Sequence, residues 1–167
     1  MTAGFDPQQL VVDHLREMGV DHEIVPCDPT LADTAEFCAA YGYAPEDSAN
    51  TIIVVGKGET PKPVACVVLA TTRLDVNGVV RRRLGVRKAS FASGDETKQL
   101  TGMELGGVTV FALPDDLPIW IDAAVMARPR IILGGGSRSI KVLTPSSTLP
   151  KLANASVVDD LARPRES

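Results

Sequence analysis

The sequence contains few of the residues on which most catalytic and metal sites depend. Its 167 residues include two histidines, His14 and His22, and three cysteines, Cys27, Cys38 and Cys66, which form no C-x-x-C pair. An odd number of cysteines at these spacings indicates neither a disulfide framework nor a zinc site. Both histidines lie near the start of the chain, outside any pattern typical of metal ligands. We therefore expect no metal, no cofactor, and buried free thiols.

The chain also lacks positive net charge and long hydrophobic runs. Its formal net charge is -4, which argues against tight, sequence-independent binding to duplex DNA but leaves a small RNA end possible as a ligand. The longest apolar runs, such as residues 64–70, are too short to span a bilayer, and Asp6 stands where a signal peptide needs an apolar core. We expect a cytoplasmic protein with no membrane partner.

Two common hydrolase signatures are absent. The segment Gly134-Gly-Gly-Ser-Arg-Ser139 has neither the spacing nor the lysine of a P-loop, so nucleotide hydrolysis is disfavoured. No G-x-S-x-G elbow occurs, and two early histidines are a weak basis for a Ser-His-Asp triad. Ordinary nucleophilic hydrolysis is therefore disfavoured as well.

What is present is a regular sequence of helix and strand signals. Asp6-Pro7 caps and begins a helix that Gly19 ends, and Ser93 opens a capping box. We expect helices over 7–18, 33–41, 75–84 and 93–100, a short helix after Thr144-Pro145, and strands over 21–27, 51–55, 64–70, 108–113, 119–123, 130–133 and 139–143. Residues 51–55 and 64–70 should form a central hairpin, and residues 163–167 a frayed tail. This order does not fit a doubly wound parallel sheet and favours a single-domain α+β fold over residues 1–167.

Two glycine runs follow the pattern of ligand-binding loops. Gly106-Gly107 precedes an expected strand, and Gly134-Gly135-Gly136-Ser137 follows another. Glycines allow the main chain to pass close to a bound group with its N–H groups exposed, so two such loops on one sheet indicate a pocket. The alternative is that both runs are plain turns.

A few polar residues near these loops are candidates for orienting a substrate: Thr109, Asp122 and Ser137. Asp122 lies within an apolar segment, so its carboxylate needs a partner. A ligand amine or hydroxyl would serve, and so would donors from a neighbouring turn.

Two further clusters each have two interpretations. Residues 81–83, with Arg87 and Lys88, form the one dense basic cluster of the sequence, which could contact a phosphate backbone but is more typical of a solvated helical face. Tyr41 and Tyr43 could stack on a base, although packing at a helix end is the commoner role.

Taken together, several segments resemble the YbaK/ProX family of aminoacyl-tRNA editing domains, which includes the editing insertion of bacterial prolyl-tRNA synthetases. The resemblance extends from about residue 22 to residue 152. It rests on the order and spacing of Asp33 to Gly42, Asn50 to Val55, Ala92-Ser93, Thr101-Gly102, Gly106-Gly107-Val108, Ile121-Asp122 and Gly134-Gly135-Gly136.

The resemblance implies a curved, mixed, largely antiparallel and barrel-like sheet surrounded by helices. It implies a pocket for the aminoacylated 3′ end of tRNA, in which ester hydrolysis proceeds without a protein nucleophile or a cofactor. The catalytic set implied by the resemblance is Asn50, Gly106, Gly107 and Thr109. Within it, backbone donors from Gly106 to Thr109 would hold the ester. Asp122 and residues 134–137 (Gly134, Gly135, Gly136 and Ser137) would bind the amino-acid side.

The sequence departs from the family pattern at two places in this set. Asn50 stands where the family has a functionally important lysine directly before the strand threonine, and an asparagine brings no positive charge. The glycine loop continues as Val108-Thr-Val-Phe-Ala112 instead of the family's x-Ser-Pro-x-Gly, so that threonine, valine and alanine replace serine, proline and glycine. Lys57 and Lys62, in the following loop, are candidates to replace the missing lysine in space.

Two hypotheses therefore follow from the sequence. The first is a trans-acting aminoacyl-tRNA deacylase with altered or reduced activity, and the second is a non-catalytic binding module for a tRNA 3′ end, a nucleotide or a synthetase partner. Asn50 is the main support for the second hypothesis. In either case we expect a monomer or a weak homodimer.

Overall fold

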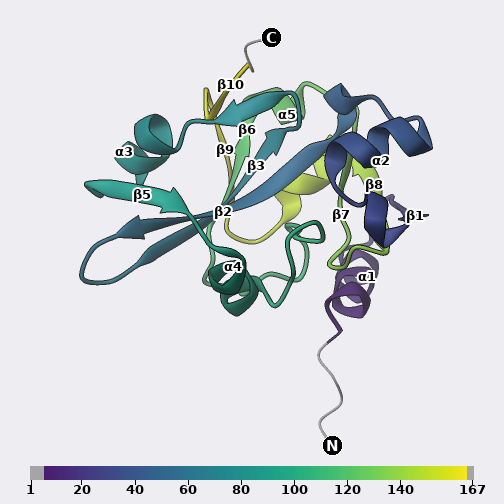
Figure 1. Cartoon of the computed structure of the whole chain (residues 1–167), viewed down its shortest axis with the longest axis horizontal. Helices are drawn as coiled ribbons and strands as arrows, with labels where there is room; N and C mark the ends of the chain where they lie inside the picture. The colour runs from purple at the N-terminus through teal and green to yellow at the C-terminus, as the bar shows by residue number, and fades with distance from the viewer. Residues whose placement is uncertain (1–5, 165–167) are drawn as a thin grey trace, which may run out of the picture.

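The computed structural model describes residues 6–164, whose strands form three sheets around a central hairpin (Figure 1). The main sheet has five strands in the order β5-β2-β3-β6-β9. Its strands are β5 (Lys88–Phe91), β2 (Ala49–Lys57), β3 (Lys62–Leu69), β6 (Ile119–Asp122) and β9 (Ala155–Val158). A three-stranded sheet contains β1 (Glu23–Pro26), β8 (Ile140–Pro145) and β7 (Arg130–Gly134), and a two-stranded sheet pairs β10 (Ala162–Pro164) with β4 (Thr72–Leu74).

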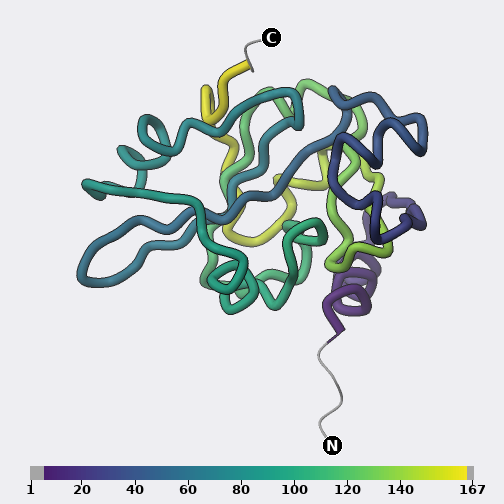
Figure 2. Tube along the Cα trace, viewed as in Figure 1, coloured from purple at the N-terminus to yellow at the C-terminus, as the bar shows by residue number. Residues whose placement is uncertain are grey.

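Helices surround these sheets on several sides, as the trace in Figure 2 shows. The α-helices are α1 (Pro7–Met18), α2 (Thr34–Tyr41), α3 (Arg81–Leu84), α4 (Gly94–Thr101) and α5 (Ala123–Met126). Shorter turns of 3-10 helix lie at Pro29–Leu31, Pro45–Asp47 and Ser146–Lys151, and a π-helical turn lies at Val76–Val80. Within residues 6–164 no helix is long and apolar enough to cross a bilayer.

The predicted central hairpin is confirmed. β2 and β3 pair antiparallel from Ala49↔Leu69 to Gly56↔Lys62. Alternating side chains of β3 enter different cores: Ala65 and Val67 join the larger cluster, which contains Phe111 and Ile121, while neighbouring residues join the smaller cluster around Trp120. Burial on both faces explains why these strands have continuous apolar sequences.

The fold class is confirmed as α+β with a mixed sheet. Five of the seven strand pairings are antiparallel, whereas β3 with β6 and β6 with β9 are parallel. The barrel-like closure expected from the resemblance does not occur, since the five-stranded sheet ends at β5 and β9. A single parallel bridge, Ser48↔Ile132, connects the five-stranded and three-stranded sheets.

Local sequence chemistry explains the helix boundaries. Asp6 accepts a hydrogen bond from the backbone N–H of Gln9, with Pro7 at the first helical position, and Gly19 ends α1 with φ 65°. Ser93 and Glu96 form the predicted capping box at the start of α4. Such caps satisfy backbone groups that a helix end would otherwise leave unpaired.

Three predictions of secondary structure were wrong. Residues 108–113 form a buried irregular segment and no strand; Phe111 is fully buried there, Ala112 has φ 59°, and its N–H donates to His14 Nδ1 at 2.7 Å. The helix expected over 75–84 is divided into a π-helical turn and α3. The frayed tail expected over 163–167 is strand β10 up to Pro164, and its last three residues lie outside the described range.

The fold shields the cysteine thiols from reagents in solution. All three cysteines are free and buried, and burial raises the pKa of the Cys66 thiol to about 12. Because the thiolate is the reactive form, iodoacetamide at about pH 8 should leave Cys66 unmodified in the folded protein and modify all three cysteines after denaturation. Peptide mass spectrometry measures this. Rapid labelling of Cys66 without loss of the folded state would contradict the structure.

Candidate functional site

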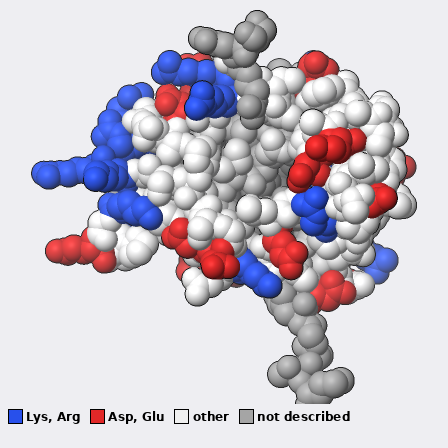
Figure 3. All heavy atoms as spheres, viewed as in Figure 1, with Lys and Arg blue, Asp and Glu red and all other residues white. Residues whose placement is uncertain are grey.

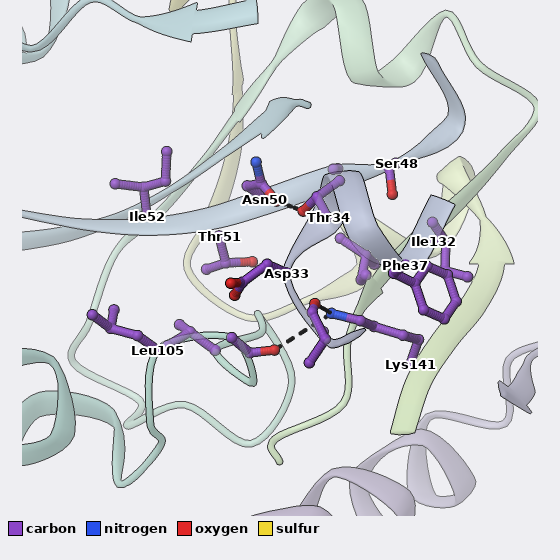
Figure 4. Close-up of a pocket in the computed structure, with 16 residues that line it drawn as sticks. Asp33, Thr34, Phe37, Ser48, Asn50, Thr51, Ile52, Leu105, Ile132 and Lys141 are labelled. Carbon is purple, nitrogen blue, oxygen red and sulfur yellow. Dashed lines mark hydrogen bonds between the residues drawn. The ribbon is translucent and has the colours of Figure 1, made fainter. Parts of the chain in front are cut away.

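A cavity of about 230 Å³ opens where the two larger sheets meet (Figure 4). β2 forms one wall, the start of α2 and the segment before it form a second, and β7, β8 and the first glycine loop complete the enclosure. The lining residues are Ala32, Asp33, Thr34, Phe37, Ser48, Ala49, Asn50, Thr51, Ile52, Leu105, Gly106, Val108, Ile132, Leu133, Gly134 and Lys141. Chain segments that are far apart in the sequence therefore build one site.

Asn50 lies in the wall formed by β2 and is held by α2. The Thr34 hydroxyl donates to Asn50 Oδ1 at 2.7 Å, so the carbonyl side of the amide is already used and its N–H₂ group remains the donor end. Next along the strand, the hydroxyl of Thr51 is buried and has no hydrogen-bond partner among the described residues. This part of the wall is polar and incompletely satisfied.

Lys141 provides the positive charge of the cavity. It extends from β8, the middle strand of its sheet, and only 8% of the residue is exposed. Its ammonium donates to the carbonyl oxygens of Ala32 at 2.6 Å and Gly106 at 3.4 Å. Burial is the main cause that lowers the pKa of Lys141 from its ordinary value of 10.5. A buried cation held by two carbonyls is a strong hydrogen-bond donor in a region of low dielectric constant.

An aromatic cluster lies beneath this lysine. Phe37 stacks with Tyr41 at 4.9 Å and with Tyr43 at 5.3 Å between ring centroids, and Lys141 Nζ lies 5.6 Å from the Phe37 ring centroid. Of the two interpretations of Tyr41 and Tyr43, these contacts favour packing at the helix end. Phe37, held by its stacking on both tyrosines, lies against the ammonium.

At the mouth of the cavity, Arg138 connects the segment before α2 with the first glycine loop. Its guanidinium donates to the carbonyl of Pro29 at 2.9 Å and to the carbonyl of Leu105 at 3.2 Å, and it forms an ion pair with Asp33 at 3.3 Å. The segment before α2 and the first glycine loop are thus held together by one side chain. Arg138 and Lys141 both come from the β7–β8 connection and its following strand.

The two glycine runs are adjacent, as the sequence indicated, but they mainly pack against each other. Gly106 and Gly134 line the cavity, whereas Gly107, Gly135 and Gly136 are not among the lining residues. The Gly136 N–H donates to the Gly107 carbonyl at 2.7 Å, and the Gly107 N–H donates to Glu104. The Gly107 amide, which we expected to hold an ester, is therefore engaged within its own turn.

The remaining residues that the sequence indicated lie outside the cavity lining. Ser137 donates to the Gln8 side chain at 2.6 Å, which holds the second glycine loop against α1. Thr109 is fully buried, and its hydroxyl has no partner within residues 6–164. Asp122 is 3% exposed and accepts from the Leu161 N–H at 3.2 Å. Burial raises the pKa of Asp122, and hydrogen bonds from backbone N–H groups oppose this shift. Of its two interpretations, the donors of a neighbouring turn fit this geometry.

The two lysines expected to replace the missing charge are elsewhere. Lys57 and Lys62 lie at the far end of the β2–β3 hairpin, where the Lys62 ammonium donates to the Leu84 carbonyl. Figure 3 shows Lys and Arg gathered over this end of the molecule, at α3, β5 and the hairpin. Arg83 of that group lies over the Trp120 ring, with its Cζ 5.2 Å from the ring centroid.

Sequence reasoning missed Lys141, Thr34 and Arg138. A signal for Lys141 existed, because a lysine between Ile140 and Val142 in an apolar strand predicts a buried charge that needs acceptors. Nothing in the sequence linked it to residues 109 positions earlier. Within the described range, no group of three or more His, Cys, Asp and Glu side chains could hold a metal ion.

Comparison with known proteins matches both the segment and its fold. The family model described as aminoacyl-tRNA editing domain matches residues 28–152. The crystal structure of a hypothetical protein superposes with a TM-score of 0.81 at 24% identity, covering 92% of this chain and 99% of that chain. The crystal structure of "a putative trans-editing enzyme for prolyl tRNA synthetase" has a TM-score of 0.81 at 22% identity, covering 98% and 100%. These matches confirm the resemblance found in the sequence.

Proposed function

The chain belongs to the aminoacyl-tRNA editing domain family, and on this basis we propose that it is a trans-acting aminoacyl-tRNA deacylase that hydrolyses mischarged esters. One observation carries the proposal: the polar cavity around Asn50 and Lys141 lies within the matched segment. At about 230 Å³ the cavity is smaller than pockets for drug-sized ligands, and this size suits a small aminoacyl group.

The chemistry requires water to attack the ester carbonyl carbon. The bond between the carbonyl carbon and the ribose oxygen then breaks, and the ribose oxygen leaves as a hydroxyl group with a proton from the attacking water. Neither histidine lines the cavity, so assistance from the substrate's own hydroxyl groups, which the family resemblance implies, fits the residues present. The Asn50 amide is the side-chain donor that we assign to the negative charge developing on the carbonyl oxygen.

Within the proposed site, the expected residues divide into two groups. Asn50, Gly106 and Gly134 line the cavity and can contact the substrate. Gly107, Gly135, Gly136 and Ser137 act through the packing of the two loops that form the mouth. Asp122 accepts the Leu161 N–H beside β6, and Thr109 is buried with a hydroxyl that has no partner within residues 6–164.

The proposed substrate also defines the partners. The chain would act as a stand-alone domain in the cytoplasm on the 3′ end of aminoacyl-tRNA, in association with an aminoacyl-tRNA synthetase. The family resemblance to prolyl-tRNA synthetase editing insertions supports a synthetase partner. We expect a monomer or a weak homodimer, which sedimentation velocity would distinguish from a stable oligomer.

A panel of mischarged tRNAs tests this function. Alanyl, cysteinyl, seryl and prolyl esters are incubated with the protein, and at least one should be released at least roughly tenfold faster than without protein, since positioned donors typically contribute more than this. Asn50→Ala should slow that release. Absence of accelerated release from every ester would remove the enzymatic proposal, and binding of tRNA without turnover would favour a non-catalytic module.

A further inference from the structure

The ammonium of Lys141 has an incomplete set of hydrogen-bond acceptors. A lysine ammonium has three N–H donors, and two of them are directed to Ala32 and Gly106. Within residues 6–164, Lys141 forms no salt bridge with a carboxylate, and Asp33, the carboxylate of the cavity lining, pairs with Arg138. The Phe37 ring centroid lies 5.6 Å from Nζ, and no oxygen of the described residues accepts the third N–H of this buried cation.

The surrounding wall adds further polar groups. Ser48, which is 5% exposed, lies in the same lining and its Oγ accepts from the Cys38 thiol at a long 3.8 Å. The Thr51 hydroxyl has no partner in the described part of the chain. In Figure 4, Thr51 lies on the β2 wall and Lys141 reaches in from β8 on the opposite side. Because the Thr51 hydroxyl is itself buried, a ligand oxygen in this cavity would meet the Lys141 ammonium as its donor.

The other lining residues limit the size of what can enter. Phe37, Ile132 and Leu133 are each 2% exposed or less and line the same cavity. They are fixed by core packing, so the cavity cannot expand at this side without disturbing the core. A bulky side chain is excluded, and a small one must lie close to the ammonium.

We propose that Lys141 makes the site selective for aminoacyl groups whose small side chain carries an oxygen acceptor, and selective against apolar side chains of similar size. This inference rests on the proposed function and adds the substrate class. A seryl, threonyl or aspartyl side chain provides the acceptor that the third N–H lacks. An alanyl side chain would close the cavity to water and leave that N–H unpaired, which is the costly case for a buried donor.

The expected discrimination is measurable. Hydrogen bonds to charged groups contribute more than neutral ones, so seryl ligands should bind on the order of 10- to 100-fold more tightly than alanyl ligands. The ligands are 3′-deoxy-3′-aminoacylamino-adenosines carrying seryl, threonyl, aspartyl, alanyl or 2-aminobutyryl groups, in which an amide replaces the ester. Calorimetry measures their affinity without turnover, and the aspartyl ligand separates a carboxylate preference from a hydroxyl preference.

Two variants test whether Lys141 is the cause. Lys141→Met retains an unbranched stem without a donor and should reduce the seryl-to-alanyl preference to about one, whereas Lys141→Gln retains an N–H and should keep part of it. Lys151→Met is the matched control, because that lysine is exposed on another segment and should leave the preference unchanged. Thermal denaturation confirms that each variant is folded.

The outcomes separate this inference from the proposed function. Equal affinity of the folded wild-type protein for seryl and alanyl ligands overturns the inference even if esters are hydrolysed, and so does a preference that Lys141→Met retains. A seryl preference that depends on Lys141, without hydrolysis of any ester, supports the inference and removes the enzymatic function. Failure to bind any of the ligands overturns both.

Discussion

Gly134→Ala should lower the free energy of unfolding by about 3 kcal/mol, the upper range for overpacking a closely packed site. A Cβ at residue 134 would lie 2.3 Å from the carbonyl oxygen of Val108 and 3.2 Å from that of Gly107. Both neighbours are backbone atoms, so no side chain can rotate away, and the two loops must separate. Because Gly134 also lines the cavity, ligand binding should weaken as well.

Urea denaturation of the variant and the wild type measures this effect. Gly58→Ala is the matched control, because a Cβ there would meet nothing closer than the Thr60 carbonyl oxygen at 3.9 Å. The control should change stability by less than about 0.5 kcal/mol, as is usual for exposed sites. Equal stability of Gly134→Ala and the wild type would show that the loops are not packed as described.

Arg138→Ala should release the mouth of the cavity while leaving the core folded. The change removes two hydrogen bonds to backbone carbonyls and the ion pair with Asp33 that together connect the segment before α2 to the first glycine loop. Loss of charge-assisted bonds of this kind should speed amide exchange in both segments by roughly tenfold or more. Hydrogen exchange read by mass spectrometry reports each segment separately.

The matched control is a change at Arg163, which forms an ion pair of the same length elsewhere in the protein. Arg163 pairs with Asp75 at 3.3 Å, between β10 and the turn after β4. Arg163→Ala should leave exchange at residues 28–33 and 104–107 unchanged. If Arg138→Ala behaves in the same way, then the two segments are held together by other contacts.

The parts of the fold that could be predicted are those with strong local signals. The capped helices α1 and α4 and the hairpin of β2 and β3 each have their cause within a few residues of sequence. β4, β5, β9 and β10 were not predicted, because each is a short strand at the edge of its sheet and depends on its partner. The short apolar run at residues 108–113 was misleading, because a buried irregular segment hides apolar side chains equally well.

The candidate site was predicted only in outline. The sequence indicated that two glycine loops meet near Asn50, and they do, but the close approach is between the loops themselves. The positive charge of the site comes from Lys141. The sequence instead favoured Lys57 and Lys62, because they follow Asn50 closely in the chain. Contacts such as Lys141 with Ala32 connect residues that only the completed sheets bring together, so no local pattern reveals them.

The separation of these segments along the chain has a consequence for how the site forms during folding. The bond from Lys141 to Ala32 closes a loop of 109 residues, and the bridge between Ser48 and Ile132 closes another long loop. The loop-closure entropy of such contacts must be overcome before they contribute stabilisation, which slows folding. We therefore expect the ligand site to be completed late in folding, when the two larger sheets dock.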